Sequence, residues 1–165
     1  MKFDQMNNFQ KLEAISTEAV RQLLPDSNVQ FTDEFENYDA FIDKVVNGQR
    51  RIAWIETKVR NAEYDDYILE ARKLKLLKQK RAAAEKELGV KINLFYLNFT
   101  PKATYIWNLD KIKVPKSTAY AGRYTAVNSA KEEKDVYYLP TKSATRVYDY
   151  VLNKEEIIKI IKDKE

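Results

Sequence analysis

The spacing of apolar residues predicts an amphipathic helix at the start of the chain. These residues recur three or four positions apart, and they are Phe3, Met6, Phe9, Leu12, Ile15, Ala19, Val20, Leu23 and Leu24. Pro25 follows directly, and proline cannot continue a helix. We therefore expect the helix to end at about Leu24, and a first short strand to follow over 29–32.

Two β-rich segments flank Asn47 and Gly48, and this arrangement predicts a hairpin. Both residues tolerate the positive φ that a two-residue hairpin turn requires. With these two residues as the loop, the numbers of each cross-strand pair sum to 95, so Asp39 lies opposite Glu56. Lys58 follows Glu56 by two positions and therefore points to the same face of the sheet.

The predicted register divides the hairpin side chains into two sets. One face, expected to point to the core, pairs Ile42 with Ala53, Ala40 with Ile55 and Tyr38 with Thr57, and Val59 extends it. The other face pairs Asp39 with Glu56, Phe41 with Trp54 and Asp43 with Ile52. A shift by one residue would mix the two sets, which favours this register.

The same kinds of pattern predict the rest of the chain. The expected elements are a long helix over 65–88, strands over 91–99 and 103–109, a polar loop or flap over 116–128, a short strand over 136–139 and a helix over 154–164. Gly89 stands where a helix C-terminus favours glycine, and Asn153 with Glu156 forms a capping box. We expect one domain over 1–165, with a core at about 3–110 and an extension over 111–165.

Composition narrows the chemistry. The chain of 165 residues contains no cysteine and no histidine, which excludes disulfides, thiolate metal sites, histidine-based triads and a histidine general base. Any hydrolysis must therefore use carboxylates, lysine and tyrosine. No apolar run is long enough to span a membrane and no signal-peptide core is present, so we expect a cytoplasmic protein without membrane contact.

The net charge of +4 is modest, but its distribution is uneven. One predicted helix carries a basic run of Arg72, Lys73, Lys75, Lys78, Lys80 and Arg81, and Arg50, Arg51, Lys58 and Arg60 flank the hairpin. Such clusters suit a phosphate backbone, although a solvated helix face would show the same pattern.

The two opposed carboxylates of Asp39 and Glu56 need a positive charge beside them. Directly opposed side chains in a sheet lie roughly 4.5–5.5 Å apart at Cβ, and like charges at that distance destabilise the sheet. A metal ion, the Lys58 ammonium or both would compensate the two carboxylates. Hard divalent cations such as Mg²⁺ prefer such oxygen ligands.

These residues resemble the motif of the PD-(D/E)XK nuclease superfamily, in which one acidic residue precedes a Glu-x-Lys on the next strand. Asp39, Glu56 and Lys58 match that motif, while Tyr38 stands in place of the proline before the first acid. The resemblance covers roughly Phe9 to Asn98. It implies an α/β, restriction-endonuclease-like core of α-β-β-β-α-β order, with a central mixed sheet of four to five strands flanked by helices.

The resemblance also implies site roles. Asp39, Glu56 and the Thr57 carbonyl would bind Mg²⁺, or Mn²⁺ as a substitute, and Lys58 would position the attacking water or the phosphate. A helix glutamate completes the metal site in many members, and Glu13 and Glu18 are both candidates, with Glu18 preferred for a two-metal site.

The second predicted helix would add basic residues. Lys73 is expected near the scissile phosphate, with Glu70 three positions before it as the residue that orients it. Arg60, Arg72 and Lys73 are the expected nucleic-acid contacts. Many members of the superfamily act as dimers, which leaves a homodimer open.

Three functions remain open at the level of sequence. The leading hypothesis is a Mg²⁺-dependent nuclease that acts on DNA more readily than on RNA. The second is a nucleic-acid-binding module of the same fold without catalysis. The third is a structural or interaction protein, such as a viral one, that uses the tyrosine-rich region over 105–150 as a binding face.

Overall fold

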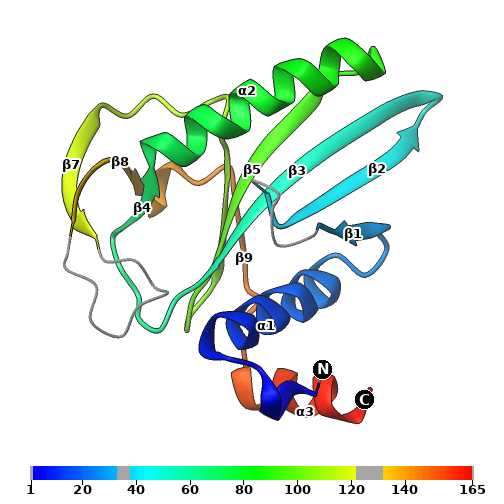
Figure 1. Ribbon diagram of the computed structural model, residues 1–165, viewed down its shortest axis with the longest axis vertical. Helices are drawn as coiled ribbons and strands as arrows, with labels where there is room; N and C mark the ends of the chain where they lie inside the picture. The colour runs from blue at the N-terminus through cyan, green and yellow to red at the C-terminus, as the bar shows by residue number, and fades with distance from the viewer. Residues whose placement is uncertain (1, 33–37, 122–131, 165) are drawn as a thin grey trace.

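The protein is built around a mixed six-stranded sheet (Figure 1). The computed structural model describes residues 2–32, 38–121 and 132–164. Across the sheet the strands are β1 (Val29–Phe31), β2 (Ala40–Val46), β3 (Gln49–Val59), β5 (Ile92–Phe99), β6 (Thr104–Asn108) and β9 (Arg146–Tyr148). Strands β3 and β5 are parallel, and every other neighbouring pair is antiparallel.

Three helices and a second, smaller sheet cover this sheet. The helices are α1 (Asn8–Leu23), α2 (Ala71–Leu88) and α3 (Lys154–Asp163), and the smaller sheet has the order β4 (Asp66–Glu70), β8 (Glu132–Pro140), β7 (Lys116–Ala121). Short 3₁₀ turns at Phe3–Gln5 and Thr141–Ser143 complete the elements. Helices α1 and α3 lie together on one side of the large sheet, and α2 lies on the other (Figure 1).

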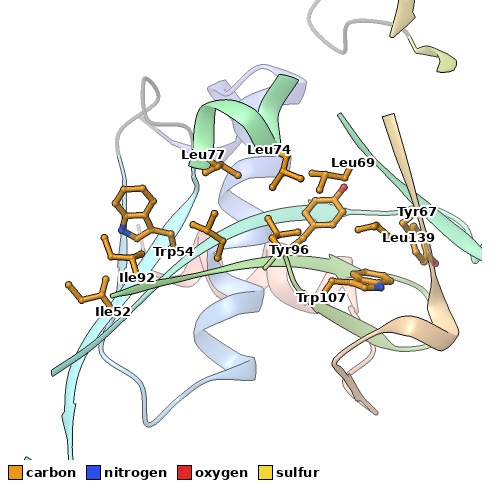
Figure 2. Close-up of a cluster of buried hydrophobic side chains, with 12 residues drawn as sticks. Ile52, Trp54, Tyr67, Leu69, Leu74, Leu77, Ile92, Tyr96, Trp107 and Leu139 are labelled. Atoms are coloured by element: carbon orange, nitrogen blue, oxygen red, sulfur yellow. The ribbon is translucent and has the colours of Figure 1, made fainter. Parts of the chain in front are cut away.

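Each side of the large sheet has its own hydrophobic core. On the α2 side, Leu74 and Leu77 of the helix pack against strand residues such as Trp54 and Tyr96, and Trp107 joins them to the small sheet (Figure 2). On the α1 side, Val20 of α1 and Ile157 of α3 both pack on the other face of β2, β3 and β5. Because both faces of the central strands are covered, polar side chains such as Glu56 and Asn98 lie within the protein rather than in solvent.

The hairpin has the predicted turn and register. Asn47 and Gly48 have φ values of 51° and 75°, and the paired residues run from Val46 with Gln49 to Ala40 with Ile55. Beyond Ala40 the prediction is wrong, because the chain bends and Asp39 no longer pairs with Glu56 across a ladder. The Asp39 amide instead donates to the Ile55 carbonyl at 2.9 Å.

This bend moves Tyr38 to the other side of the sheet. We expected Tyr38 on the face that packs with Ile42, but its ring stacks on Trp54 with ring centres 4.2 Å apart. Trp54 belongs to the core on the α2 side. The stacking of the two rings therefore outweighs the simple alternation of the strand, and it fixes the chain direction as it enters β2.

Three further predictions need correction. Residues 66–70 form strand β4 rather than the first turn of the helix predicted over 65–88, which begins at Ala71. The segment predicted as a loop over 116–128 begins with strand β7, and residues 122–128 lie outside the described part. The central sheet has six strands rather than four to five, because the three-residue strand β9 adds an edge.

The fold class is α/β with a central mixed sheet flanked by helices, as predicted. The core elements α1, β1, β2, β3, α2 and β5 follow the expected order, with β4 inserted before α2. The predicted end of α2 is confirmed, since Gly89 has a φ of 66° after it. Of the capping box predicted at the start of α3, the structure shows one half, in which the Asn153 side chain accepts from the Glu156 amide. In the described ranges no helix is both long and apolar enough to cross a membrane.

Candidate active site

Glu56 on strand β3 is the buried centre of a charged cluster. Its side chain is 2% exposed, and both of its oxygens are paired with lysines. The Lys58 ammonium donates to Oε1 at 2.7 Å, and the Lys73 ammonium lies 2.8 Å from Oε2. Lys58 follows on the same strand, whereas Lys73 projects from α2, so the helix packed on this face of the sheet supplies the second cation.

Asp39 lies beside this cluster and is held by Thr57. Its Oδ2 accepts from the Thr57 amide at 2.6 Å and from the Thr57 hydroxyl at 2.8 Å. The Thr57 hydroxyl also contacts the Ser16 hydroxyl of α1. Since the single hydroxyl proton of Thr57 goes to the carboxylate, Ser16 must donate to Thr57, which gives a chain of hydrogen bonds from α1 to Asp39.

The electrostatics of Asp39 differ from those of an ordinary surface carboxylate. Burial raises the pKa of Asp39, and the neighbouring negative charge of Glu56 raises it further, while Lys58 and Lys73 oppose the change. The two carboxylates therefore repel one another, and a cation near both would offset that repulsion. The bend at Asp39 therefore still brings this acid beside Glu56, although not through the cross-strand pair that the sequence predicted.

Lys58 remains a cation in this environment. Burial would lower the pKa of the Lys58 ammonium, but the negative charges of Glu56 and Asp39 outweigh that effect and hold the pKa well above its usual value. A protonated amine cannot accept a proton. The arrangement therefore suits Lys58 for binding an anion or orienting water rather than for general-base catalysis.

A cavity of about 670 Å³ opens beside these residues. It lies between α1, the ends of β1 and β3 and the start of α2, and Asp39, Thr57, Lys58 and Lys73 all line it. Basic side chains also reach it from three other places in the chain, namely Lys11 of α1, Arg60 after β3 and Lys154 of α3. The site therefore combines buried carboxylates with a positively charged cavity.

Arg60 is fixed within this cavity by a polar network. Its Nε donates to Asn98 Oδ1 at 2.7 Å, and its NH2 group donates to the Tyr96 hydroxyl at 2.8 Å. The Tyr96 hydroxyl donates in turn to the Ile68 carbonyl at 2.9 Å. Arg60 was predicted as a nucleic-acid contact; it lines the cavity, and Asn98 and Tyr96 hold its guanidinium in a defined orientation.

The two candidate glutamates of α1 lie in different places. Glu13 lines the cavity, whereas Glu18 does not. The Glu18 carboxylate is 7% exposed at the side chain and is paired with Lys164 at 2.8 Å and Arg21 at 3.7 Å. The structure therefore places the Glu18 carboxylate with Lys164 and Arg21 and does not bring it together with Asp39.

Two residues predicted on the second helix also lie outside the cavity. Glu70 ends strand β4 and pairs with Lys134 at 3.0 Å, so Glu56 rather than Glu70 holds Lys73. Arg72 is exposed on the first turn of α2 and does not line the cavity. The insertion of β4 explains the position of Glu70, because it changes the direction in which residues before Ala71 point.

The side chains at this site are of the type that binds a divalent cation, and there are enough of them for one ion but not for two. Asp39 and Glu56 offer carboxylate oxygens, and one or two carboxylates are the usual protein contribution to a Mg²⁺ site. Glu56 Oε2 makes an ion pair without a hydrogen bond, so it retains capacity to bind a cation. Across the described ranges, no group of three or more acidic side chains is placed to hold a metal ion together.

Sequence reasoning missed several residues that complete the site. Ser16, Lys11 and Lys154 reach it from helices whose docking depends on the tertiary structure. For Ser16 a signal was present in the sequence, because a serine one position after Ile15 stands on the apolar face of the first helix. A polar residue on such a face has to find a buried partner.

Comparisons with known proteins find similarity among solved structures. No protein-family model matches the sequence, and no curated protein is detectably similar to it. Among solved structures, the chain is similar to that of Hjc, a Holliday junction resolvase from the archaeal hyperthermophile Archaeoglobus fulgidus, determined at 1.6 Å resolution. The match has 13% sequence identity and a TM-score of 0.41, and it covers 76% of this chain and 90% of the resolvase chain.

Proposed function

We propose that the protein is a metal-dependent nuclease that hydrolyses phosphodiester bonds, with DNA as the favoured substrate. The observation that supports this most directly is the buried Glu56 carboxylate, paired with Lys58 and Lys73 beside Asp39 at a positively charged cavity. Burying a carboxylate such as that of Glu56 is costly for stability, so a buried acid held by two lysines at a cavity is typical of a functional site.

Each residue of the cluster has a role in this proposal. Asp39, Glu56 and the Thr57 carbonyl would hold Mg²⁺, or Mn²⁺ in its place. The bound cation would neutralise charge on the scissile phosphate and make a water molecule more acidic. The protonated Lys58 orients the attacking water and stabilises developing negative charge, and Lys73 binds a phosphate oxygen.

The positioning of Asp39 depends on α1. Thr57 donates two hydrogen bonds to one oxygen of Asp39, and Ser16 supports the Thr57 hydroxyl. Because these hydrogen bonds fix Oδ2, they also set the direction of the other carboxylate oxygen, Oδ1. The helix α1 thus contributes orientation to the site through Ser16.

Cleavage assays test this function. Supercoiled, linear, single-stranded and branched DNA, with RNA of matched sequence, would be incubated with Mg²⁺, Mn²⁺ or EDTA. We expect cleavage that needs a divalent cation and that Glu56→Gln and Lys58→Met both abolish. Glu70→Gln is a matched control and should cut at the wild-type rate, since this glutamate also pairs with a lysine, but its partner Lys134 does not line the cavity, whereas both lysines of Glu56 do.

The opposite result would favour a different function. If the protein binds nucleic acid but cleaves no substrate at any metal concentration tested, it is a binding module. The absence of both binding and cleavage would leave a structural or interaction protein of this fold.

A further inference from the structure

The depth of the carboxylates restricts what can reach them. Glu56 is 2% exposed and Asp39 is half-buried, so neither acid projects freely into solvent. The cavity beside them has a volume of about 670 Å³, within the roughly 300–1,000 Å³ typical of sites for small molecules. A base-paired double helix is far wider than such a cavity, whereas one or two nucleotides of a single strand would fill it.

The lining of the cavity includes surfaces suited to bases as well as to phosphates. Tyr38 and Phe31 both line it, together with the apolar side chains of Leu12 and Val59. A site that only touched the outer phosphates of a duplex would have no use for these apolar groups. Aromatic rings beside a basic groove are the usual means of binding single-stranded nucleic acid, because every base can stack on a ring.

Both aromatic rings are held in place by their neighbours. The Tyr38 ring stacks on Trp54 at 4.2 Å with an interplanar angle of 13°. The Arg21 guanidinium lies over the Phe31 ring at 4.7 Å. Rings that are already fixed lose little conformational freedom when a base packs against them, which favours binding.

The charge of the residues that line the cavity also favours single-stranded nucleic acid as the ligand. Among the described residues that line the cavity, five are basic, namely Lys11, Lys58, Arg60, Lys73 and Lys154, and two are acidic, Glu13 and Asp39. The basic residues come from α1, β3, the segment after β3, α2 and α3, so they surround the cavity rather than follow one helix face. Such an arrangement attracts a phosphate-bearing strand into the cavity.

We infer that the substrate enters this cavity as an unpaired strand, with a base packed against Tyr38 and the adjoining phosphate carried to Asp39, Lys58 and Lys73. The site therefore acts on single-stranded nucleic acid, or on the unpaired segment of a duplex that carries one. This inference specifies the substrate class of the nuclease proposed above and rests on that function. A duplex without unpaired nucleotides would first have to extrude a nucleotide, which costs free energy.

Binding measurements without cleavage test the inference. The wild-type protein would be titrated in EDTA with three probes of one sequence, a single-stranded DNA, a blunt duplex and the duplex with a short unpaired tail. Each probe carries a 2-aminopurine, whose fluorescence falls when it stacks on an aromatic ring. We expect the single strand and the tailed duplex to bind at least about tenfold more tightly than the blunt duplex, with quenching only when the 2-aminopurine is unpaired.

Variants assign the stacking to one residue. Tyr38→Leu should weaken single-strand binding about tenfold and remove the quenching, whereas Tyr38→Phe should retain both. Tyr64→Leu is the control, because Tyr64 is 57% exposed and does not line the cavity. If Tyr38→Leu fails to fold, Phe31→Leu serves as the second variant, and the preference of the wild-type protein among the three probes stands as an independent test.

The outcomes separate this inference from the proposed function. Equal binding of blunt duplex and single strand, or no binding of either, would overturn the inference, and so would a free deoxynucleoside monophosphate that binds as tightly as the strand. Metal-dependent cutting of a blunt duplex in preference to a single strand would overturn it while the nuclease proposal stands. Quenched single-strand binding with no cleavage in Mg²⁺ would support it while the nuclease proposal fails.

Discussion

The ammonium nitrogen of Lys73 lies 2.8 Å from Oε2 of Glu56, and this contact joins helix α2 to the central strand β3. The glutamate is 2% exposed at its side chain and the lysine is 29% exposed, so water screens the pair weakly. Lys58 occupies the other oxygen of the same carboxylate. The two lysines together supply the positive charge that allows Glu56 to lie within the sheet.

Replacing Lys73 should therefore destabilise the protein as well as impair cleavage. Lys73→Met leaves the buried Glu56 carboxylate with Lys58 alone. We expect the free energy of unfolding to fall by about 2 kcal/mol, less than the roughly 3–5 kcal/mol that breaking a fully buried ion pair costs, because Lys58 still compensates the charge. Urea denaturation monitored by tryptophan fluorescence measures this loss. The double variant Glu56→Gln, Lys73→Met should recover part of it, because the uncompensated charge is then absent.

Lys75→Met is the matched control for that experiment. Lys75 is exposed on the same helix and does not line the cavity, so its replacement should change stability by less than about 0.5 kcal/mol. If both lysine variants unfold at the same urea concentration, the ion pair between Lys73 and Glu56 does not stabilise the fold.

Asp39→Asn should stabilise the protein while it abolishes cleavage. Burial raises the pKa of Asp39 above its usual 3.8, so the folded protein binds this proton more tightly than the unfolded chain does. Stability is therefore lost as pH rises from about 3.8 through the raised pKa, and the loss is complete above it. At neutral pH the asparagine variant avoids this loss, because it carries no charge. We expect its free energy of unfolding to be higher than that of the wild type by about 1 kcal/mol, or its Tm by a few degrees.

Thermal unfolding of the two proteins across the acid range checks the sign. The difference in Tm between Asp39→Asn and the wild type should be small at the lowest pH and grow as pH rises. The other carboxylates titrate in both proteins, so the difference isolates Asp39. A variant that is less stable than the wild type at neutral pH would show that the hydrogen bonds from Thr57 to the charged carboxylate outweigh its burial.

The parts of the site that could be predicted are those fixed by local geometry. The turn at Asn47 and Gly48 sets the register of β2 and β3, and residues two apart on a strand share a face. The contact between Glu56 and Lys58 follows from these two rules. Asp39 lies one residue beyond the regular ladder, and there the same rules give the right neighbourhood with the wrong pairing.

The parts that could not be predicted depend on partners far away in the chain. Residues 66–70 have apolar spacing compatible with a helix, but they form β4 because Tyr67 and Leu69 pair with Leu139 and Tyr137 of β8. The choice between Glu13 and Glu18 is similar, since Lys164 of the C-terminal segment neutralises Glu18. Local patterns do not contain these contacts, so sequence reasoning left them open or wrong.

Thr57→Val should separate orientation of Asp39 from general stability. The substitution removes the hydroxyl that donates to Asp39 and accepts from Ser16 but keeps the shape of the side chain. We expect a loss of about 1–2 kcal/mol from the unpaired Ser16 hydroxyl and a fall in cleavage rate of about tenfold or more. Unfolding in urea and cleavage under single-turnover conditions measure the two effects.

Thr104→Val provides the matched control for Thr57. Thr104 is fully buried, and its hydroxyl donates to the Tyr150 carbonyl at 2.9 Å, away from the cavity. Its replacement should reduce stability by a similar amount and leave the cleavage rate of the folded protein unchanged. Equal falls in cleavage for both threonine variants would show that the effect arises from stability rather than from the position of Asp39.

Addition of a divalent cation should stabilise the folded protein through Asp39 and Glu56. A ligand that binds only the folded state raises stability with its concentration, by about 2.7 kcal/mol at a hundred times its Kd. We expect Mg²⁺ and Mn²⁺ to raise the Tm of the wild type in proportion to the logarithm of their concentration, and EDTA to reverse the increase. Glu56→Gln and Asp39→Asn should lose most of this response. Asp43→Asn should retain it, because Asp43 is a half-buried carboxylate that is paired with Arg50 and does not line the cavity. An equal rise in all four proteins would indicate cation binding to the surface in general and would argue against a metal site at Asp39 and Glu56.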